Sequence, residues 1–218
     1  MSSQYIGTKF QTVFKDKNII KNKNISILTK WCNKFAELGL SPKLIGGFGG
    51  NLSYRTAKGF IITASRVNLK NLSENDFVEI IEADILSKKV VVKGTNLPSS
   101  ESLLHYYVYS QRPEINAVFH GHDENVLQKC NQLKLPITER EQPYGSVELI
   151  EEVGKILQNY FYLVLKNHGF LSLGETMDKA GNLALQIHRS TDTLTVTNGC
   201  ILHSTPLTHS EASASETK

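Results

Sequence analysis

Short strand-like runs and longer segments of helical period follow one another along the chain, and this order limits the folds that it can adopt. Apolar residues between Ile27 and Leu38 recur at helical spacing, and Gly39 follows as a helix stop. Further helices are predicted from Pro98-Ser99-Ser100 to Arg112-Pro113, over 123–133, after Ser146, and over 176–194. The chain therefore carries several amphipathic helices that need a common apolar surface to cover.

Strands are predicted where β-branched and aromatic residues gather between turn signals. These runs are 5–14, 52–55, 60–63, 77–81, 90–93, 115–122, 136–138 and 160–165. The second and third runs form a hairpin around Lys58-Gly59. Because short antiparallel strands come early and helix–strand alternation comes later, the order predicts an α/β fold in which helices cover one mixed sheet.

Composition excludes several classes of protein. The 218 residues fit one domain of ordinary size, and 40% hydrophobic with 21% charged residues is a folded, globular balance. With 24 Lys and Arg against 21 Asp and Glu, the net charge of +3 is too small an excess for a dedicated nucleic-acid binder. Since no apolar run has the length of a membrane span, no membrane association is expected.

The cysteines and the two ends complete this outline. Cys32, Cys130 and Cys200 are an odd number at wide spacings, which favours free thiols and a cytoplasmic protein. Residues 1–24 are predicted to be a polar N-terminal extension without the apolar core of a secretory signal. Residues 25–200 are expected to form the domain, and 201–218 a disordered tail.

His120-Gly121-His122 is the motif that points most directly to chemistry. Residues i and i+2 of a strand lie on the same side, so two imidazoles can hold one metal ion between them. His168, at the end of another predicted strand, is the best candidate for the third nitrogen of a catalytic zinc site with one open position. The same spacing also arises by chance on a solvated strand edge.

Two further motifs suit an anion but also have structural interpretations. Pro98-Ser99-Ser100-Glu101, followed by His105, offers hydroxyls, free backbone N–H groups and a carboxylate at a helix start. The same residues are an ordinary helix cap. The glycine-rich segment 46–51 can fold into a phosphate-binding nest or can only reverse the chain, and it lacks the Gly-Lys-Ser/Thr of a P-loop.

Taken in order, five motifs give a specific resemblance. They are Gly49-Gly50-Asn51-Leu52-Ser53-Tyr54-Arg55, Gly59-Phe60-Ile61-Ile62-Thr63-Ala64-Ser65, Pro98-Ser99-Ser100-Glu101 with His105, Ala117-Val118-Phe119-His120-Gly121-His122 after Arg112-Pro113, and Asn167-His168-Gly169. Their order and spacing, which cover the chain from about Ile27 to Leu194, resemble the class II aldolase/adducin family. The resemblance implies a three-layer α/β/α fold with a central mixed, largely antiparallel sheet, and a homotetramer with active sites between subunits.

The resemblance also implies roles for single residues. His120, His122 and His168 match the zinc ligands, and Glu101 matches the acid/base carboxylate. The substrate phosphate is expected to be held by a further set: Gly50, Asn51, Ser65, Ser99 and Ser100. Zinc would act as a Lewis acid on a short ketose 1-phosphate similar to fuculose 1-phosphate, and would stabilise the enediolate that carbon–carbon cleavage leaves.

The chain departs from the family pattern at two places. Arg66 stands where the family's phosphate turn has glycine, and its guanidinium either grips a phosphate or carboxylate or points to solvent. The family's tyrosine near the C-terminus has no counterpart, because no tyrosine follows Tyr162. Tyr144, or His203 or His209 in the tail, is a candidate replacement for it.

Three functions fit these residues. The first is a zinc-dependent sugar-phosphate aldolase, a lyase of carbohydrate metabolism. The second is a zinc-dependent dehydratase of the methylthioribulose-1-phosphate type, for which Glu141 lies close to where such enzymes carry an acid/base glutamate. The third is a non-catalytic adducin-like interaction module, which the presence of all three histidines and Glu101 disfavours. Aspartate replaces Glu101 in the related epimerases, so epimerisation is also disfavoured.

Overall fold

A computed structural model describes residues 7–196 of the chain. Its centre is an eight-stranded sheet with the strand order β1-β7-β6-β5-β4-β8-β10-β9. The strands are β1 (Gln11–Asp16), β4 (Asn51–Thr56), β5 (Gly59–Thr63), β6 (Phe77–Asp84), β7 (Lys89–Lys93), β8 (Ala117–Gly121), β9 (Tyr162–Leu165) and β10 (Gly169–Gly174). Neighbouring strands are antiparallel except for β1 and β7, which are parallel. The sheet is therefore mixed and largely antiparallel, as predicted.

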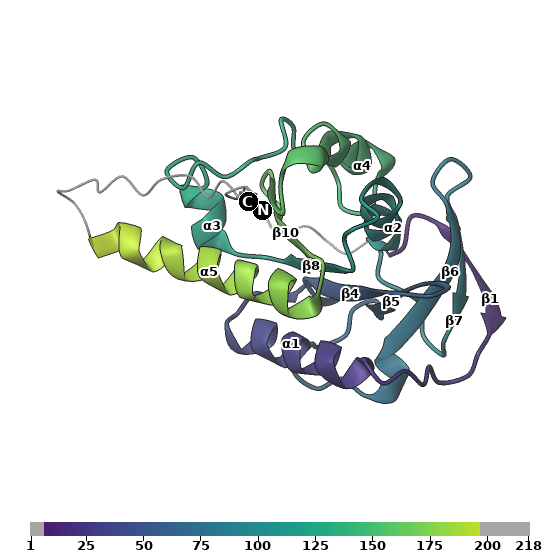
Figure 1. The fold of residues 1–218 in the computed structure, drawn as a ribbon. Helices are drawn as coiled ribbons and strands as arrows, with labels where there is room; N and C mark the ends of the chain where they lie inside the picture. The colour runs from purple at the N-terminus through teal and green to yellow at the C-terminus, as the bar shows by residue number, and fades with distance from the viewer. Residues whose placement is uncertain (1–6, 197–218) are drawn as a thin grey trace, which may run out of the picture.

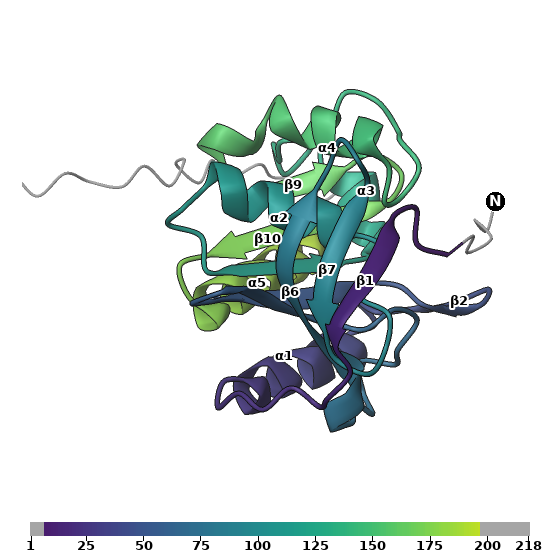
Figure 2. The same cartoon turned by 90° about the vertical axis from the view of Figure 1, so that its right-hand side faces the viewer.

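Helices cover both faces of this sheet (Figure 1, Figure 2). They are α1 (Ile25–Glu37), α2 (Ser102–Gln111), α3 (Glu124–Lys129), α4 (Val147–Gly154) and α5 (Met177–Val196), with short 3₁₀ turns at Glu74–Asp76 and Leu157–Asn159. Helices α1, α3 and α5 share one apolar core with the sheet, and α2 and α4 share the other. This arrangement confirms the three-layer α/β/α prediction.

Aromatic side chains fill the core beneath α1. The Phe35 ring, which is fully buried, meets the edge of the Phe119 ring with centroids 5.6 Å apart, and lies 6.1 Å from the Phe170 ring. Phe119 and Phe170 come from the neighbouring strands β8 and β10. Because Phe119 precedes His120, the packing that holds α1 on the sheet also fixes the end of β8.

Strand register brings the predicted motifs together. Asn51 at the start of β4 lies opposite His120 of β8, and Leu171 of β10 lies opposite His120 on the other side. Glu101 directly precedes α2, which packs over β6 on the face that α4 shares. Segments distant in sequence thus converge at one end of the central strands.

The structure corrects three predictions of secondary structure. Strand β10, within Gly169–Gly174, was not predicted, because it is buried on both sides and lacks the polar alternation of a half-exposed strand. The run 136–138 contributes only one isolated parallel bridge, between Ile137 and Val164. The helix predicted over 123–133 ends at Lys129 and is followed by turns.

The glycine-rich segment also contains structure that its composition concealed. Residues Lys43–Leu44 (β2) and Gly47–Phe48 (β3) form a small separate hairpin beside the main sheet. The hydroxyl of Ser41 donates a hydrogen bond of 2.7 Å to the carbonyl oxygen of Gly49. This bond holds together the two ends of the hairpin, just before β4 begins at Asn51.

The two ends of the chain are described unequally. Strand β1 lies within the predicted extension 1–24 and is part of the sheet. The predicted tail 201–218 and Cys200 lie outside the described residues. Cys32 and Cys130 are buried free thiols. Across residues 7–196, no helix combines the length and the apolar character that a membrane crossing requires.

The Phe35 contact predicts a large stability effect. Replacing Phe35 with alanine should lower the free energy of unfolding by about 3–5 kcal/mol, since the buried ring leaves a cavity between α1 and β8. Leu86→Ala is the matched control, because Leu86 is 94% exposed and its loss should cost less than about 0.5 kcal/mol. Urea denaturation of both variants measures the difference, and equal midpoints would contradict the proposed packing role.

Candidate metal centre

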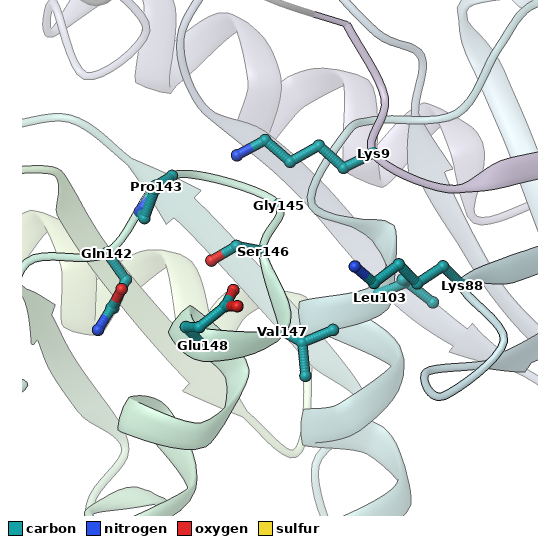
Figure 3. A pocket seen from close by; sticks show the side chains of 9 residues that line it. All are labelled: Lys9, Lys88, Leu103, Gln142, Pro143, Gly145, Ser146, Val147 and Glu148. Atoms are coloured by element: carbon teal, nitrogen blue, oxygen red, sulfur yellow. The ribbon is translucent and has the colours of Figure 1, made fainter.

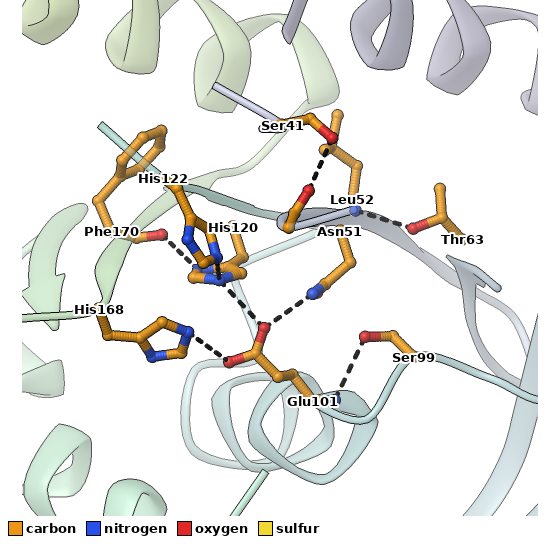
Figure 4. A network of polar contacts seen from close by, with 11 residues as sticks. Ser41, Asn51, Leu52, Thr63, Ser99, Glu101, His120, His122, His168 and Phe170 are labelled. Carbon is orange, nitrogen blue, oxygen red and sulfur yellow. Dashed lines mark hydrogen bonds and ion pairs between the residues drawn. The ribbon is translucent and has the colours of Figure 1, made fainter. Parts of the chain in front are cut away.

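Three histidines meet at the end of strands β8 and β10 (Figure 4). His120 is the penultimate residue of β8 and its side chain is fully buried, His122 lies one residue beyond that strand, and His168 lies in the turn between β9 and β10. Their ring centroids are 4.9–5.1 Å apart, and one donor nitrogen from each lies within 4.8 Å of the others. The structure therefore brings together all three histidines that the sequence singled out.

The orientation of His120 is fixed by a backbone carbonyl. Its Nδ1 donates a hydrogen bond of 2.8 Å to the carbonyl oxygen of Phe170, which can only accept. Nδ1 therefore carries a proton, and the ring is oriented so that Nε2 faces the cluster. That Nε2 lies 3.1 Å from Nε2 of His122.

Burial keeps the other two imidazoles neutral. Desolvation, together with the neighbouring imidazoles of His120 and His168, lowers the pKa of His122 well below its ordinary value. Burial, with His120 as a second cause, lowers the pKa of His168 to about 3. Since a lowered histidine pKa leaves the ring neutral at pH 7, both side chains are in the form that binds metal ions.

Glu101 faces the histidines from the start of α2. Its carboxylate is 3% exposed, and Asn51 Nδ2 donates a hydrogen bond of 2.8 Å to Oε2. The same Oε2 lies 3.1 Å from His120 Nε2, and Oε1 lies 3.6 Å from His168 Nε2. Although Glu101 occupies the N-cap position, its side chain caps no helical N–H group. The carboxylate is directed to the site and not to the helix.

The donor set fits a divalent cation. His120 Nε2 and Glu101 Oε2 lie 3.1 Å apart, so a nitrogen donor and an anionic oxygen donor converge on one place. Three buried polar atoms here also have no hydrogen-bond partner within residues 7–196, namely Asn51 Oδ1, Glu101 Oε1 and His168 Nδ1. Three imidazole nitrogens beside one carboxylate are a typical ligand set for zinc and related ions.

A pocket beside the histidines gathers the remaining predicted residues. Its lining includes Gly50, Asn51, Ser65, Arg66, Ser99, Ser100, Glu101, His122, Tyr144 and His168, together with Leu44, Phe48, Gly49 and Ala64. Of the last four, only Leu44 lies outside the motifs named in the sequence. Leu44 belongs to the β2–β3 hairpin, and only knowledge of that hairpin would have indicated it.

Two residues of this pocket have a left-handed backbone. Gly50 has φ +78°, and a Cβ atom there would lie 3.0 Å from the carbonyl oxygen of His120. Glycine is required at that position because the backbone passes so close to the metal-facing strand. Arg66 has φ +68°, which is uncommon for a residue with a side chain and occurs most often where the surrounding structure imposes it.

Glu141 lies near the site without lining the pocket. Its Oε2 accepts a hydrogen bond of 2.7 Å from Asn167 Nδ2, and both side chains are exposed. Asn167 has φ +55° and precedes His168 in the β9–β10 turn. The observed role of Glu141 is thus to hold the turn that carries a metal-facing histidine.

His105 belongs to a second buried cluster. Its Nδ1 lies 2.7 Å from Ser53 Oγ, which lies 2.8 Å from the Tyr109 hydroxyl. Burial lowers the pKa of His105 to about 3, against the opposing effect of Glu101. His105 is not part of the pocket lining, so its position four residues after Glu101 does not bring it into the metal-facing set.

Known proteins resemble this chain over the part that contains these site residues. The family model described as "Class II Aldolase and Adducin N-terminal domain" matches residues 27–195. An L-fuculose phosphate aldolase of Methanococcus maripaludis is 32% identical over 163 residues, which cover 67% of this chain and 84% of that protein. A 5-methylthioribulose-1-phosphate/5-deoxyribulose-1-phosphate aldolase of Escherichia coli O45:K1 is 28% identical over 197 residues, 81% of this chain and 84% of its own.

Solved structures share the fold. An L-fuculose 1-phosphate aldolase superposes with a TM-score of 0.67 at 25% identity, and covers 82% of this chain and 87% of its own. The L-fuculose-1-phosphate aldolase of Thermus thermophilus gives a TM-score of 0.64 at 22% identity, over 78% of this chain and 92% of its own.

The geometry predicts that the three histidines bind one divalent metal ion per chain. His122→Ala and His168→Ala should each lower metal content to well under half, because two nitrogens no longer complete the site. His188→Ala is the control, since His188 lies outside the cluster and pairs with Asp123 instead. Elemental analysis after dialysis against metal-containing buffer measures the stoichiometry. Equal metal content in all four proteins would contradict the assignment.

Proposed function

Because the chain belongs to the class II aldolase and adducin family, we propose that it is a zinc-dependent aldolase of a short ketose 1-phosphate, similar to fuculose 1-phosphate. The observation that carries this proposal is the cluster of three histidines with the Glu101 carboxylate 3.1 Å from His120. The relatives named as sugar-phosphate aldolases support the reaction class. Zinc is the proposed ion because three nitrogen donors with an open position suit it.

His120, His122 and His168 would hold the zinc ion. When bound, it supplies Lewis-acid polarisation of the ketose carbonyl and compensates the negative charge that develops on cleavage. The hydrogen bond from His120 to Phe170 keeps the imidazole in the tautomer that can coordinate. The neutral forms of His122 and His168 remove proton competition near pH 7.

Glu101 is the proposed proton-transfer group. When the carbon–carbon bond breaks, the hydroxyl that becomes the aldehyde loses one proton, and the carbon that keeps the electron pair gains one. Transfer of this proton through the Glu101 carboxylate would leave Glu101 unchanged after each cleavage. Glu101 lies in reach of the cluster, and Asn51 holds one of its oxygens by a hydrogen bond of 2.8 Å. Since the carboxylate is buried, few water molecules compete for the proton.

The phosphate is assigned to the small polar residues of the pocket. Ser65, Ser99 and Ser100 line it together with Asn51, and Gly50 lets the backbone approach closely. Arg66 lines the same pocket and would add a charge-assisted contact. Binding of the phosphate orients the substrate against Glu101 and contributes little to bond breaking itself.

We further propose a cytoplasmic homotetramer with active sites between subunits. Exposed apolar side chains at Leu44 and Ile45, in the hairpin beside the pocket, support a subunit contact at this place.

Product analysis separates the candidate functions. The zinc-loaded protein should release dihydroxyacetone phosphate and an aldehyde from a ketose 1-phosphate in a panel of such sugars. Loss of water without aldehyde release, abolished by Glu141→Gln, would replace the aldolase with the dehydratase. A purified protein that binds no divalent metal and shows neither activity would support the adducin-like interaction module.

Glu101→Gln should keep the fold and most of the metal while lowering kcat by about 10²–10⁴-fold, the usual loss for a positioned acid/base group. The amide matches the carboxylate in shape, so melting temperature and metal content serve as controls in the same preparation. Turnover close to wild type would reduce Glu101 to a structural residue.

Arg66→Gly should raise KM for the phosphorylated substrate by about tenfold, as expected for loss of a charge-assisted contact. Glycine tolerates the observed φ of +68°, so the side chain is removed without strain in the turn. Arg66→Lys keeps the charge and should recover part of the loss. An unchanged KM in the glycine variant would mean that the guanidinium does not touch the substrate.

A further inference from the structure

Tyr144 lines the pocket at the end of a loop that rests on the phosphate-facing residues. The next residue, Gly145, has φ +64°, and a Cβ atom there would lie 2.6 Å from the carbonyl oxygen of Ser100. The loop backbone therefore sits directly on Ser100. This close approach leaves the Tyr144 side chain in one pocket lining with Ser100, Glu101 and His168.

A lysine from the N-terminal segment covers the same tyrosine. Lys9 Nζ lies 4.8 Å from the centroid of the Tyr144 ring, within the range of a cation–π contact. Figure 3 shows Lys9 reaching toward the loop that carries Pro143 and Gly145. Gly145 and Lys9 both line a second cavity of about 410 Å³, so the loop lies between that cavity and the pocket beside the histidines.

The position of Lys9 is well anchored. Phe10, the next residue, is 8% exposed and belongs to the core that α2 and α4 share. The backbone N–H of Gln11 donates a hydrogen bond of 2.8 Å to the carbonyl oxygen of Lys88, and β1 then runs parallel to β7. Lys9 therefore lies just before an anchored strand, next to a buried core residue.

Lys9 lies outside the part of the chain that matches the family model, which begins at residue 27, whereas Tyr144 lies inside it. We propose that Tyr144 contacts the sugar phosphate and that Lys9 is a positioning residue that holds the Tyr144 ring in the pocket. The proposal rests on the proposed function. It assigns the segment just before β1 a part in substrate selection, because the shape of the pocket wall depends on a residue that this segment supplies.

The charges around Lys9 suit a positioning role. Lys88 and Glu148 line the second cavity with it and are the charged groups that act on the Lys9 ammonium. Their opposite charges leave Lys9 one favourable and one unfavourable neighbour, so the ring of Tyr144 adds an attractive contact that neither provides. Lys88 shares the cavity without an observed contact to the ring, which makes it a matched control.

The test compares Tyr144→Ala, Lys9→Gln, their double variant and Lys88→Gln, using the ketose 1-phosphate that the wild-type enzyme cleaves. Tyr144→Ala should raise KM by about tenfold, and Lys9→Gln by about twofold to fivefold, the loss of an exposed cation–π contact. The double variant should be no worse than Tyr144→Ala, because Lys9 acts through the ring. Lys88→Gln should leave KM unchanged, and kcat and metal content should change less than KM in every variant.

Three results would overturn the assignment of Tyr144 and Lys9: additive effects of the two substitutions, an unchanged KM in Tyr144→Ala, or an equal effect of Lys88→Gln. Cleavage of the substrate by the wild type would still leave the proposed function intact. A metal-loaded wild type that cleaves no sugar phosphate would instead overturn the proposed function, and the inference with it.

Discussion

The site depends on where the backbone of β8 is held. His120 has β4 on one side and β10 on the other, so main-chain pairing from both neighbours fixes its position. The carbonyl of Phe170 then fixes the orientation of its ring. Strand β4 also places Asn51 opposite His120, and Asn51 holds the Glu101 carboxylate by a hydrogen bond. The register between β4 and β8 therefore determines how far His120 lies from Asn51. A slip by one residue would turn each of these side chains to the opposite face.

Burial gives this geometry its chemical character. Imidazoles and an acidic group withdrawn from water are costly to bury without partners, so a cation bound by these atoms would also stabilise the fold. The second buried cluster consists of Ser53, His105 and Tyr109. The Ser53 hydroxyl forms hydrogen bonds with both other side chains, so it needs no cation as a partner. Desolvation lowers the pKa of both His105 and His168. The two rings nevertheless have different neighbours, because His105 contacts Ser53 and His168 lies beside two other histidines.

Much of this arrangement was predictable from the sequence, because the motifs are local. The histidine pair, Ser99-Ser100-Glu101 and Asn167-His168-Gly169 are short segments whose side chains point where their own backbone directs them. Strand β10 was missed because a strand buried on both faces, with glycine at each end, lacks the alternation that marks a half-exposed one. The contact between Lys9 and Tyr144 joins residues 135 positions apart, and no periodicity indicates it. The functional assignments of the individual residues remain predictions.

The parallel pairing of β1 with β7 has a consequence beyond the pocket. Strand β7 carries three consecutive valines, Val90, Val91 and Val92, between two lysines. Without β1 its outer row of N–H and C=O groups would be an open edge, and an edge rich in β-branched residues recruits strands from other molecules. The polar strand Gln11–Asp16, with Lys15 and Asp16 at its end, covers that row. The N-terminal segment that supplies Lys9 therefore also protects the protein from aggregation, because its strand β1 covers β7. Loss of this pairing would favour aggregation through β7 before the core unfolds.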